Sequence, residues 1–369
     1  LLFTLTLAGD AGISLWLTTS ADRFGRKRTL ILGALLMLGA GLAFILTRNI
    51  VVLMAAAVIG VISPSGNEIG PFLSVEQASL SHLLPAERRT QGFAWYNLAG
   101  SFATALGALS GGWLAQFLQR NGMPALEAYR FVLAGYAPGG PVPAVLFLSL
   151  SSEVEVRESA DEASGPRLLG LHRSRGVVAR LSALFALDAF AGGLIVQSMI
   201  AYWFQLKYRV DPGVIGSIFF GANVLAGISA LLAVRLAKRF GLINTMVFTH
   251  IPSNILLILV PLMPTLPLAI AVLLLRFSIS QMDVPTRQSY TMAVVAPDER
   301  SAASGVTGIA RSVGAALSPS LTGLLLSAPA LISAPFFLAG GLKIIYDLLL
   351  YRSFRAARPP EEAAASGQK

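Results

Sequence analysis

Cysteine is absent from the 369 residues and charged side chains are scarce, so several classes of protein are excluded at once. Without cysteine the chain forms no disulfide framework and no thiolate metal site. Three histidines, His82, His172 and His250, lie far apart and lack the spacing of metal ligands, so we expect no metal and no cofactor. Asp, Glu, Lys and Arg make up 13% of the residues, whereas about 25% is typical of soluble domains.

Apolar residues, in contrast, make up 54% of the chain, more than a soluble fold of this length can bury. A helix that crosses the hydrocarbon core of a bilayer needs about 20 mostly apolar residues. Eleven segments of this kind follow one another, and they predict an all-α polytopic membrane protein. They are 1–20, 29–47, 50–82, 91–118, 130–150, 178–206, 213–235, 242–263, 266–296, 301–327 and 331–351.

The net charge of +9 is distributed unevenly between the two sets of loops. Five basic residues, Arg48, Arg120, Arg130, Lys207 and Arg209, lie in one set. Most of the others lie in the alternate set, at 21–28, 83–90, 151–180, 235–241 and 297–300 and in the tail after 351. The positive-inside rule places this basic side, with the C-terminus, in the cytoplasm. The pattern indicates membrane topology rather than a nucleic-acid partner.

An internal repeat divides the chain. Three pairs match at offsets of 212 to 216 residues: Phe24-Gly25 with Phe240-Gly241, PAER at 85–88 with PDER at 297–300, and Gly111 with Gly323. Three matches in one order indicate duplication. The segment 178–206 then needs a partner before residue 1, so we expect twelve spans with the first missing from this chain. The predicted units are a first half at 1–150, a cytoplasmic linker at 151–177 and a second half at 178–369.

Two motifs resemble the major facilitator superfamily, and the resemblance covers essentially the whole chain. The loop after the second span of that family carries G-x-x-x-D-R-x-G-R-K/R; here Thr18 replaces the leading glycine. The fifth span of proton antiporters in the family carries G-P-x-x-G-G, which residues 107–112 match except for Ala108. The resemblance assigns a cytoplasmic gate motif to Asp22, Arg23, Gly25, Arg26, Lys27 and Arg28.

This resemblance implies a fold of two pseudo-symmetric six-helix bundles around a central cavity. Spans one, four, seven and ten would line the cavity, and the halves would rock about it in alternating access. Substrate-cavity candidates are the polar side chains of the spans around it, Asn97, Gln197, Asn223 and Tyr290.

Charges inside the spans each need a partner or a function, because an ion in the bilayer is costly. The predicted spans hold six acids, Asp10, Glu68, Glu76, Asp188, Asp283 and Asp347, and four bases, Arg276, Arg287, Arg311 and Lys343. Even complete pairing leaves two carboxyl groups, which suits proton transport.

Depth in the membrane selects candidates for transport and proton coupling. Glu76, Asp188 and Arg287 lie about 12–15 Å from the cytoplasmic ends of their spans, at a rise of about 1.5 Å per residue. We expect them to meet in the inner half of the cavity. Asp283 is placed four residues before Arg287, either as a local structural partner or as part of the site. Glu68 either faces the cavity or satisfies a broken helix.

Two further pairs are predicted from position. Asp10 and Arg311 lie at matching depths in spans that abut across the halves, so we expect an ion pair between the bundles; the alternative is that each pairs within its own half. Asp347 lies near the predicted end of its span and is interpreted as an interfacial residue, with Lys343 as an i, i+4 partner.

The function favoured by these patterns is secondary active transport of a small solute, with proton-coupled efflux ahead of an uptake symporter or facilitator. A receptor or scaffold without transport is a minor alternative. No Ser–His–Asp set, HExxH, GxSxG or P-loop motif occurs, which argues against an enzyme or an ATP-driven pump. Expected partners are the solute, protons and the lipid bilayer. We expect a monomer in a bacterial or archaeal inner membrane.

Overall fold

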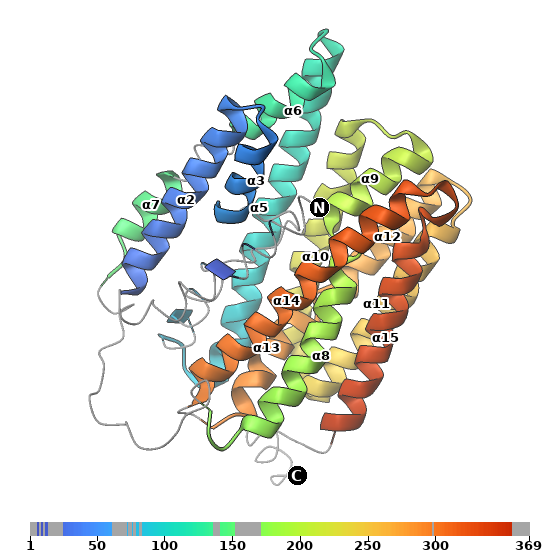
Figure 1. Cartoon of the computed structure of the whole chain (residues 1–369). Coiled ribbons are helices and arrows are strands. Elements are labelled where there is room, and N and C mark those ends of the chain that lie inside the picture. Colours follow the sequence, from blue (N-terminus) through green and yellow to red (C-terminus); the bar gives the residue numbers. More distant parts are fainter. Residues whose placement is uncertain are drawn as a thin grey trace.

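The computed structural model describes residues 25–60, 83–135, 141–151, 171–296 and 299–355, together with Thr6, Gly9, Gly12, Ile13, Phe72, Glu76, Ser79 and Leu80. The regular elements in these residues are helices (Figure 1), which confirms the predicted all-α class. Eight helical stretches are long and apolar enough to cross a membrane: Arg26–Leu46, Thr90–Arg120, Arg175–Tyr208, Pro212–Phe240, Leu242–Leu262, Leu266–Ala293, Ala302–Ser327 and Pro329–Phe354. They correspond to eight of the eleven predicted segments.

The remaining three predicted segments are shorter or fall outside the described residues. The segment 50–82 begins with the ten-residue helix α3 (Ile50–Ile59). The segment 130–150 is divided between α6 (Ala125–Ala134) and α7 (Pro141–Leu148). Most of 1–20 and of the linker 151–177 lies outside the described residues.

Basic side chains hold the first-half helices together at their ends. The long helices there are α2 (Arg26–Leu46) and α5 (Ala86–Arg120), and α2 lies beside α3, α6 and α7 (Figure 1). Lys27 donates to the carbonyls of Leu148 and Leu150 at 2.6 and 3.2 Å, at the end of α7. Arg130 donates to the carbonyls of Ile45 and Thr47, at the end of α2. Both cations satisfy carbonyls that a helix C-terminus leaves unpaired.

The second half contains α8 (Arg175–Gly193), α9 (Gln197–Tyr208), α10 (Pro212–Phe240), α11 (Leu242–Leu259), α12 (Leu266–Ser280), α13 (Asp283–Ala293), α14 (Arg300–Ser327) and α15 (Ala334–Phe354). Short 3₁₀ turns at Val260–Leu262 and Pro329–Leu331 follow α11 and precede α15. One apolar core centres on the fully buried Trp203, whose ring lies 4.7 Å from that of Phe336. A second core at the other end of the bundle includes Phe185, Tyr290 and Tyr346.

The repeat detected in the sequence has a structural counterpart at two helix starts. Gly25 and Gly241, aligned at an offset of 216, have φ of 94° and 86° and immediately precede α2 and α11. Such positive φ values favour glycine because it lacks a Cβ atom. Four residues on, the Thr29 and Thr245 hydroxyls donate to the carbonyls of these glycines at 3.0 and 2.8 Å. The two helix starts are therefore the same local structure.

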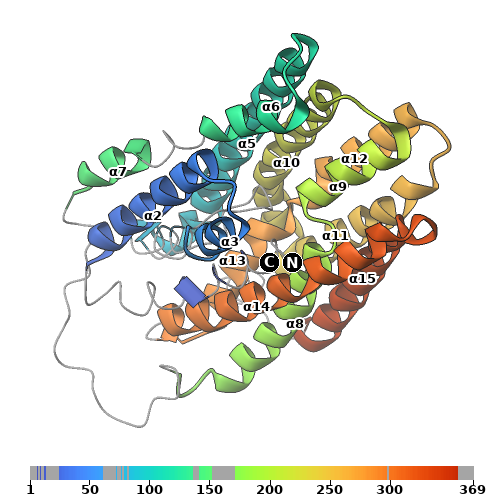
Figure 2. The same ribbon diagram turned by 45° about the horizontal axis from the view of Figure 1, so that its top comes forward.

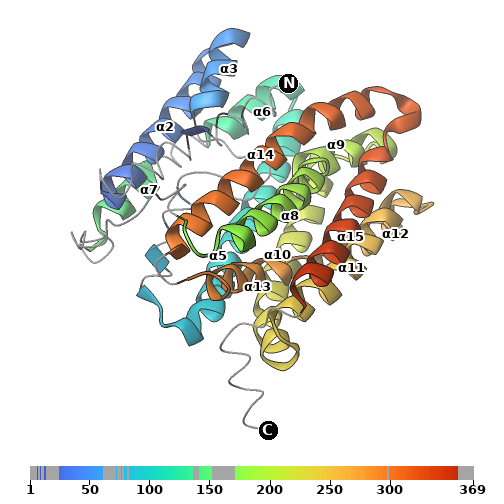
Figure 3. The same ribbon diagram turned by 60° about the horizontal axis from the view of Figure 1, so that its bottom comes forward.

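The basic residues gather at one end of the bundle. The beginnings of α2, α5, α8 and α14 and the ends of α10 and α15 lie at the lower end in Figure 1, and Figure 3 shows this end turned forward. These termini carry most of the basic residues in the described part of the chain. The ends of α2, α5 and α9 and the helix α6 lie at the opposite end. These elements carry or precede Arg48, Arg120, Arg130, Lys207 and Arg209. The helix connectivity therefore separates the two sets of loops as the charge pattern predicts.

Two of the membrane-length spans are interrupted near their middle. The span Arg175–Tyr208 breaks at residues 194–196, and Leu266–Ala293 breaks at 281–282. Pro285 explains the second break, because proline removes the hydrogen bond to the carbonyl four residues earlier. Hydroxyls of neighbouring helices satisfy the backbone groups that the breaks release. Thr322 donates to the carbonyl of Leu194 at 2.9 Å, and Ser229 accepts from the N–H of Gln281 at 3.3 Å.

The two halves meet along α5 and α10, which lie side by side (Figure 2). Their backbones approach so closely at Gly112 and Gly216 that neither position has room for a side chain. A Cβ atom on Gly112 would lie 2.6 Å from the carbonyl oxygen of Pro212, and one on Gly216 would lie 2.5 Å from that of Ala108. The glycine-rich segment 107–112 thus has a packing role at the contact between the halves.

We predict that Gly112→Ala destabilises the protein by about 1–3 kcal/mol, because the added methyl group overpacks a backbone contact. The matched control is Gly107→Ala in the same helix, where a Cβ atom meets nothing within 4 Å. The measurement is the apparent melting temperature of each purified variant in detergent. Equal melting temperatures for the two variants would contradict the close contact of α5 with α10.

Candidate functional site

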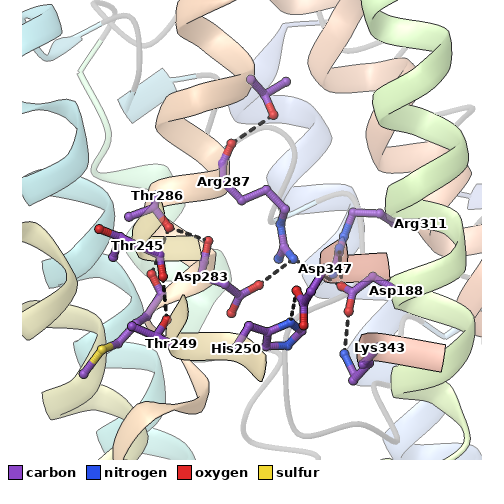
Figure 4. Close-up of polar contacts among 12 residues, drawn as sticks. Asp188, Thr245, Thr249, His250, Asp283, Thr286, Arg287, Arg311, Lys343 and Asp347 are labelled. Carbon is purple, nitrogen blue, oxygen red and sulfur yellow. Dashed lines mark hydrogen bonds and ion pairs between the residues drawn. The ribbon is translucent and has the colours of Figure 1, made fainter. Parts of the chain in front are cut away.

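The buried carboxylate of Asp188 on α8 is bound by three cations from three other helices (Figure 4). Lys343 on α15 places Nζ 2.5 Å from Oδ1. Arg287 on α13 and Arg311 on α14 each place Nη1 3.2 Å from Oδ2. Asp188 is 3% exposed, so water provides almost none of the compensation that a buried charge requires. The carboxylate therefore ties α8, α13, α14 and α15 together.

Arg287 also pairs with a second carboxylate, that of Asp283, at 2.9 Å one helical turn earlier. The break before α13 places Asp283 in the first turn of this helix, where the helix dipole favours an anion. The predicted meeting of Asp188 with Arg287 is thus present in the structure, and Arg287 bridges the two acids. The Asp283–Arg287 contact is both a local pair and a part of the site.

The third buried acid is Asp347, which the sequence analysis interpreted as an interfacial residue. It is 1% exposed rather than interfacial, because α11 packs on this face of α15. His250 Nδ1 lies 2.8 Å from one carboxylate oxygen, and the Asn254 amide donates to the other at 3.1 Å. Lys343, expected beside Asp347, instead binds Asp188. Sequence reasoning missed the role of His250 because its partner is 97 residues away along the chain.

We predict that Asp347→Ala lowers the free energy of unfolding by about 1–3 kcal/mol, because it leaves the buried His250 and Asn254 groups without their acceptor. Arg352→Ala, at an exposed position one turn further along α15, is the control and should change stability by less than about 0.5 kcal/mol. Thermal unfolding of both variants in detergent tests this. An interfacial Asp347 would give two variants of equal stability.

Polar contacts connect this network to the first half. The Thr90 hydroxyl on α5 shares a 2.6 Å hydrogen bond with the Ser289 hydroxyl on α13. Two turns further along α5, the Asn97 amide lies 3.5 Å from Gln288 Oε1, also on α13. The helix that carries Asp283 and Arg287 therefore contacts both halves.

The other predicted site residues occupy separate places. Glu76 accepts a 2.5 Å hydrogen bond from the Tyr96 hydroxyl, and among the described contacts it pairs there rather than with Asp188 or Arg287. Asn223 donates to Gln197 at 3.1 Å, so these two cavity candidates lie together. Tyr290 is fully buried in the apolar core of the second half, where it packs against Phe354 rather than lining an open cavity.

Several predicted residues lie outside the described residues, namely Asp10, Asp22, Arg23 and Glu68. Arg311 binds Asp188 of its own half, as the alternative to the Asp10 pair has it for this residue. The roles of Asp10 and of the other three residues stay predictions. Within the gate motif, Gly25 starts α2, Arg26 is buried, Lys27 binds the end of α7 and Arg28 is exposed.

Glu299 belongs to the repeated segment PDER at 297–300, and its side chain caps the N-terminus of α8. Its carboxylate accepts the backbone N–H groups of Arg173 and Ser174 at 2.8 Å each and that of His172, whose Nδ1 lies at 2.9 Å. Burial alone would raise the pKa of Glu299, but hydrogen bonds from the Ser174 hydroxyl and the three N–H groups lower it to about 2. The connection between α13 and α14 is thereby fixed to the start of α8.

Because the pKa of Glu299 is about 2 in the folded protein against 4.5 ordinarily, its stabilising effect is present above pH 4.5 and is lost as the pH falls toward 2. We predict that Glu299→Gln lowers the melting temperature at pH 7, and that the difference from the wild type shrinks below about pH 4.5. Glu127→Gln, which removes an exposed ion pair with Arg48, is the control. A difference that is constant between pH 7 and pH 3 would contradict this assignment.

A bundle of membrane-length helices, two of them interrupted beside a buried ionic network, has the architecture of a membrane transporter. The chain belongs to the Major Facilitator Superfamily, whose family model matches residues 1–274 and 181–369. Members of this superfamily are transporters, and the chain is an integral membrane protein with the corresponding multi-pass fold.

Known proteins agree with this assignment. An uncharacterized membrane protein of Saccharomyces cerevisiae, YJR124C, is 31% identical over 379 aligned positions, which cover 95% of this chain and 84% of the yeast protein. Because this relative is from yeast, the predicted bacterial or archaeal origin has no support. The human organic anion transporter MFSD10 (TETRAN) is similar in structure, with a TM-score of 0.66, 18% identity and coverage of 94% of this chain and 82% of that chain.

Two further structures share the fold. The proton:xylose symporter XylE matches with a TM-score of 0.69 and 15% identity, covering 94% of this chain and 84% of XylE. A bacterial homologue of the iron transporter ferroportin matches with a TM-score of 0.63 and 15% identity, covering 95% and 89% of the two chains. An organic anion, a sugar and iron differ in their chemistry, so the substrate has to be argued from the side chains.

Proposed function

We propose that this protein is a secondary active transporter that exports a small organic solute in exchange for protons by alternating access. The halves at 1–150 and 178–369 are the units that rock, joined by the linker 151–177, and the protein acts as a monomer. The basic end of the bundle and the C-terminus face the cytoplasm, because basic loops are retained on that side.

The observation that carries the proposal is the position of α13. This helix follows a break in its span, carries Asp283 and Arg287 of the ionic network, and contacts α5 of the other half through Ser289 and Gln288. A solute that alters the network therefore acts on the same helix that joins the halves. Such a connection supports coupling of solute binding to a change in the relative position of the halves.

Proton coupling is assigned to Glu76. This half-buried carboxyl contacts the neutral hydroxyl of Tyr96, whereas Asp188 is surrounded by three cations that favour its charged form. Among the described residues no cation lies beside Glu76, and such a carboxyl group can accept and release a proton at lower cost than Asp188 can. Exchange in the direction of efflux is supported by the resemblance of residues 107–112 to the motif of proton antiporters.

Everted membrane vesicles with an acid interior test this function. A panel of organic anions, organic cations and sugars is added, and a pH-sensitive dye follows the gradient. We expect one class of solute to collapse the gradient in vesicles that contain the full-length protein. Glu76→Gln should reduce this solute-dependent proton movement at least about tenfold, because it removes the group that releases the proton.

The control Glu127→Gln, at a surface position, should retain the wild-type rate. Proton movement that survives in Glu76→Gln would refute the assignment of this residue. Solute accumulation that requires the opposite gradient would replace antiport by the uptake symporter, and solute movement that is independent of any gradient would indicate a facilitator.

A further inference from the structure

The ionic network around Asp188 contains more positive than negative charge. Arg287, Arg311 and Lys343 contact two carboxylates, those of Asp188 and Asp283. The third buried acid, Asp347, is engaged by His250 and Asn254. With Arg276, a fourth buried cation on the span that carries Arg287, four cations face three carboxylates within the described part of the chain. This region is therefore one negative charge short of balance before any solute binds.

Arg311 is the cation whose pairing is weakest. Its Nη1 and the Nη1 of Arg287 lie at the same distance, 3.2 Å, from a single oxygen of Asp188. The two guanidinium groups thus share one acceptor, although an arginine presents five N–H donors and pairs best with both oxygens of one carboxylate. Arg287 has Asp283 as a second partner, but among the described residues Arg311 makes no further ion pair.

Arg311 is also the most accessible of the three cations. Its side chain is 35% exposed, whereas those of Arg287 and Lys343 are 10% exposed. Figure 4 shows Arg311 beside Asp188, opposite the side on which Lys343 binds. A ligand can therefore reach the guanidinium of Arg311 without displacing the buried pairs.

The fourth cation, Arg276, lies in the interrupted span that also carries Asp283. Arg276 near the end of α12 is 8% exposed, and its Nε has no hydrogen-bond partner within the described residues. No ion pair of Arg276 is found there either. Its charge adds to the positive potential on the span that carries Arg287, and this potential favours an anion.

We infer that the transported solute is an organic anion whose carboxylate, sulfonate or phosphate group binds Arg311 beside Asp188. This inference rests on the proposed transport function and adds the class of substrate to it. The guanidinium fork of Arg311 matches such groups in geometry, and the bound anion supplies the missing negative charge. A cationic solute would be repelled by the same groups, and a neutral solute would leave the charge unbalanced.

Binding to the purified full-length protein tests the inference without a gradient. Matched pairs of an acid and its amide serve as probes: benzoate and benzamide, indole-3-acetate and indole-3-acetamide, octanoate and octanamide. Titrations follow the rise in melting temperature that a ligand of the folded state produces. We expect one or more of the acids to stabilise the protein, and its amide to bind at least about tenfold more weakly.

Arg311→Gln should weaken binding of that acid by at least about tenfold, since it removes a charged pair. Arg311→Lys keeps the charge but lacks the fork, so it should bind with intermediate affinity, which also shows that loss in Arg311→Gln does not arise from misfolding. Arg352→Gln, at the exposed end of α15, should bind like the wild type.

The inference is overturned if none of the acids stabilises the protein, if acid and amide bind equally, or if Arg311→Gln retains the wild-type affinity. These outcomes differ from failure of the transport function. Acid-specific binding with no solute movement in vesicles would refute transport and leave the anion site in place. Proton-coupled movement of a cation or a sugar alone would refute the anion class and leave transport in place.

Discussion

The burial of the Asp188 carboxylate is the constraint on which the second half of the molecule depends. A carboxylate removed from water is tolerated when cations and hydrogen bonds replace its hydration, and removal of one partner from such a cluster typically costs about 3–5 kcal/mol. Lys343, Arg287 and Arg311 provide the replacement from three helices. The orientations of α13, α14 and α15 around α8 are therefore fixed by one charged group, and the apolar cores on either side of it fill the remaining space.

The interrupted spans also depend on internal partners for polar groups. In lipid every backbone polar group needs an internal partner, so a broken helix persists where a neighbour supplies one. Thr322 and Ser229 do so at the two breaks, and the first turn of α13 receives Asp283. The second break thus places Asp283 at the start of α13, where it pairs with Arg287. In a transporter such positions are the ones that meet the solute.

Two kinds of contact join the halves, and they differ in how readily they can break when the halves move. Close backbone packing of α5 on α10 at Gly112 and Gly216, which Gln116 extends by accepting the N–H of Gly213 at 2.9 Å, can serve as a fixed contact. Hydrogen bonds between the side chains of α5 and α13, such as that of Thr90 with Ser289, can exchange for bonds to water. The proposed alternating access needs both properties, a contact about which the halves move and a contact that breaks when they do. An anion at Arg311 would bind close to the second kind.

The sequence by itself determined that the protein lies in a lipid bilayer and that its fold is all-helical. Apolar runs of membrane length and asymmetric basic loops are local patterns, and the match of Gly25 with Gly241 reflects a backbone conformation that favours glycine. The sequence also predicted that Asp188 lies near Arg287, because depth along a helix follows from counting residues. What tertiary structure decided was pairing. Counting could not tell that Lys343 binds Asp188 instead of Asp347, that His250 meets Asp347 or that Glu299 caps α8. A charge in lipid takes the partner that helix packing brings within reach, and that choice depends on the rotation of each helix about its axis, which a list of residues does not specify.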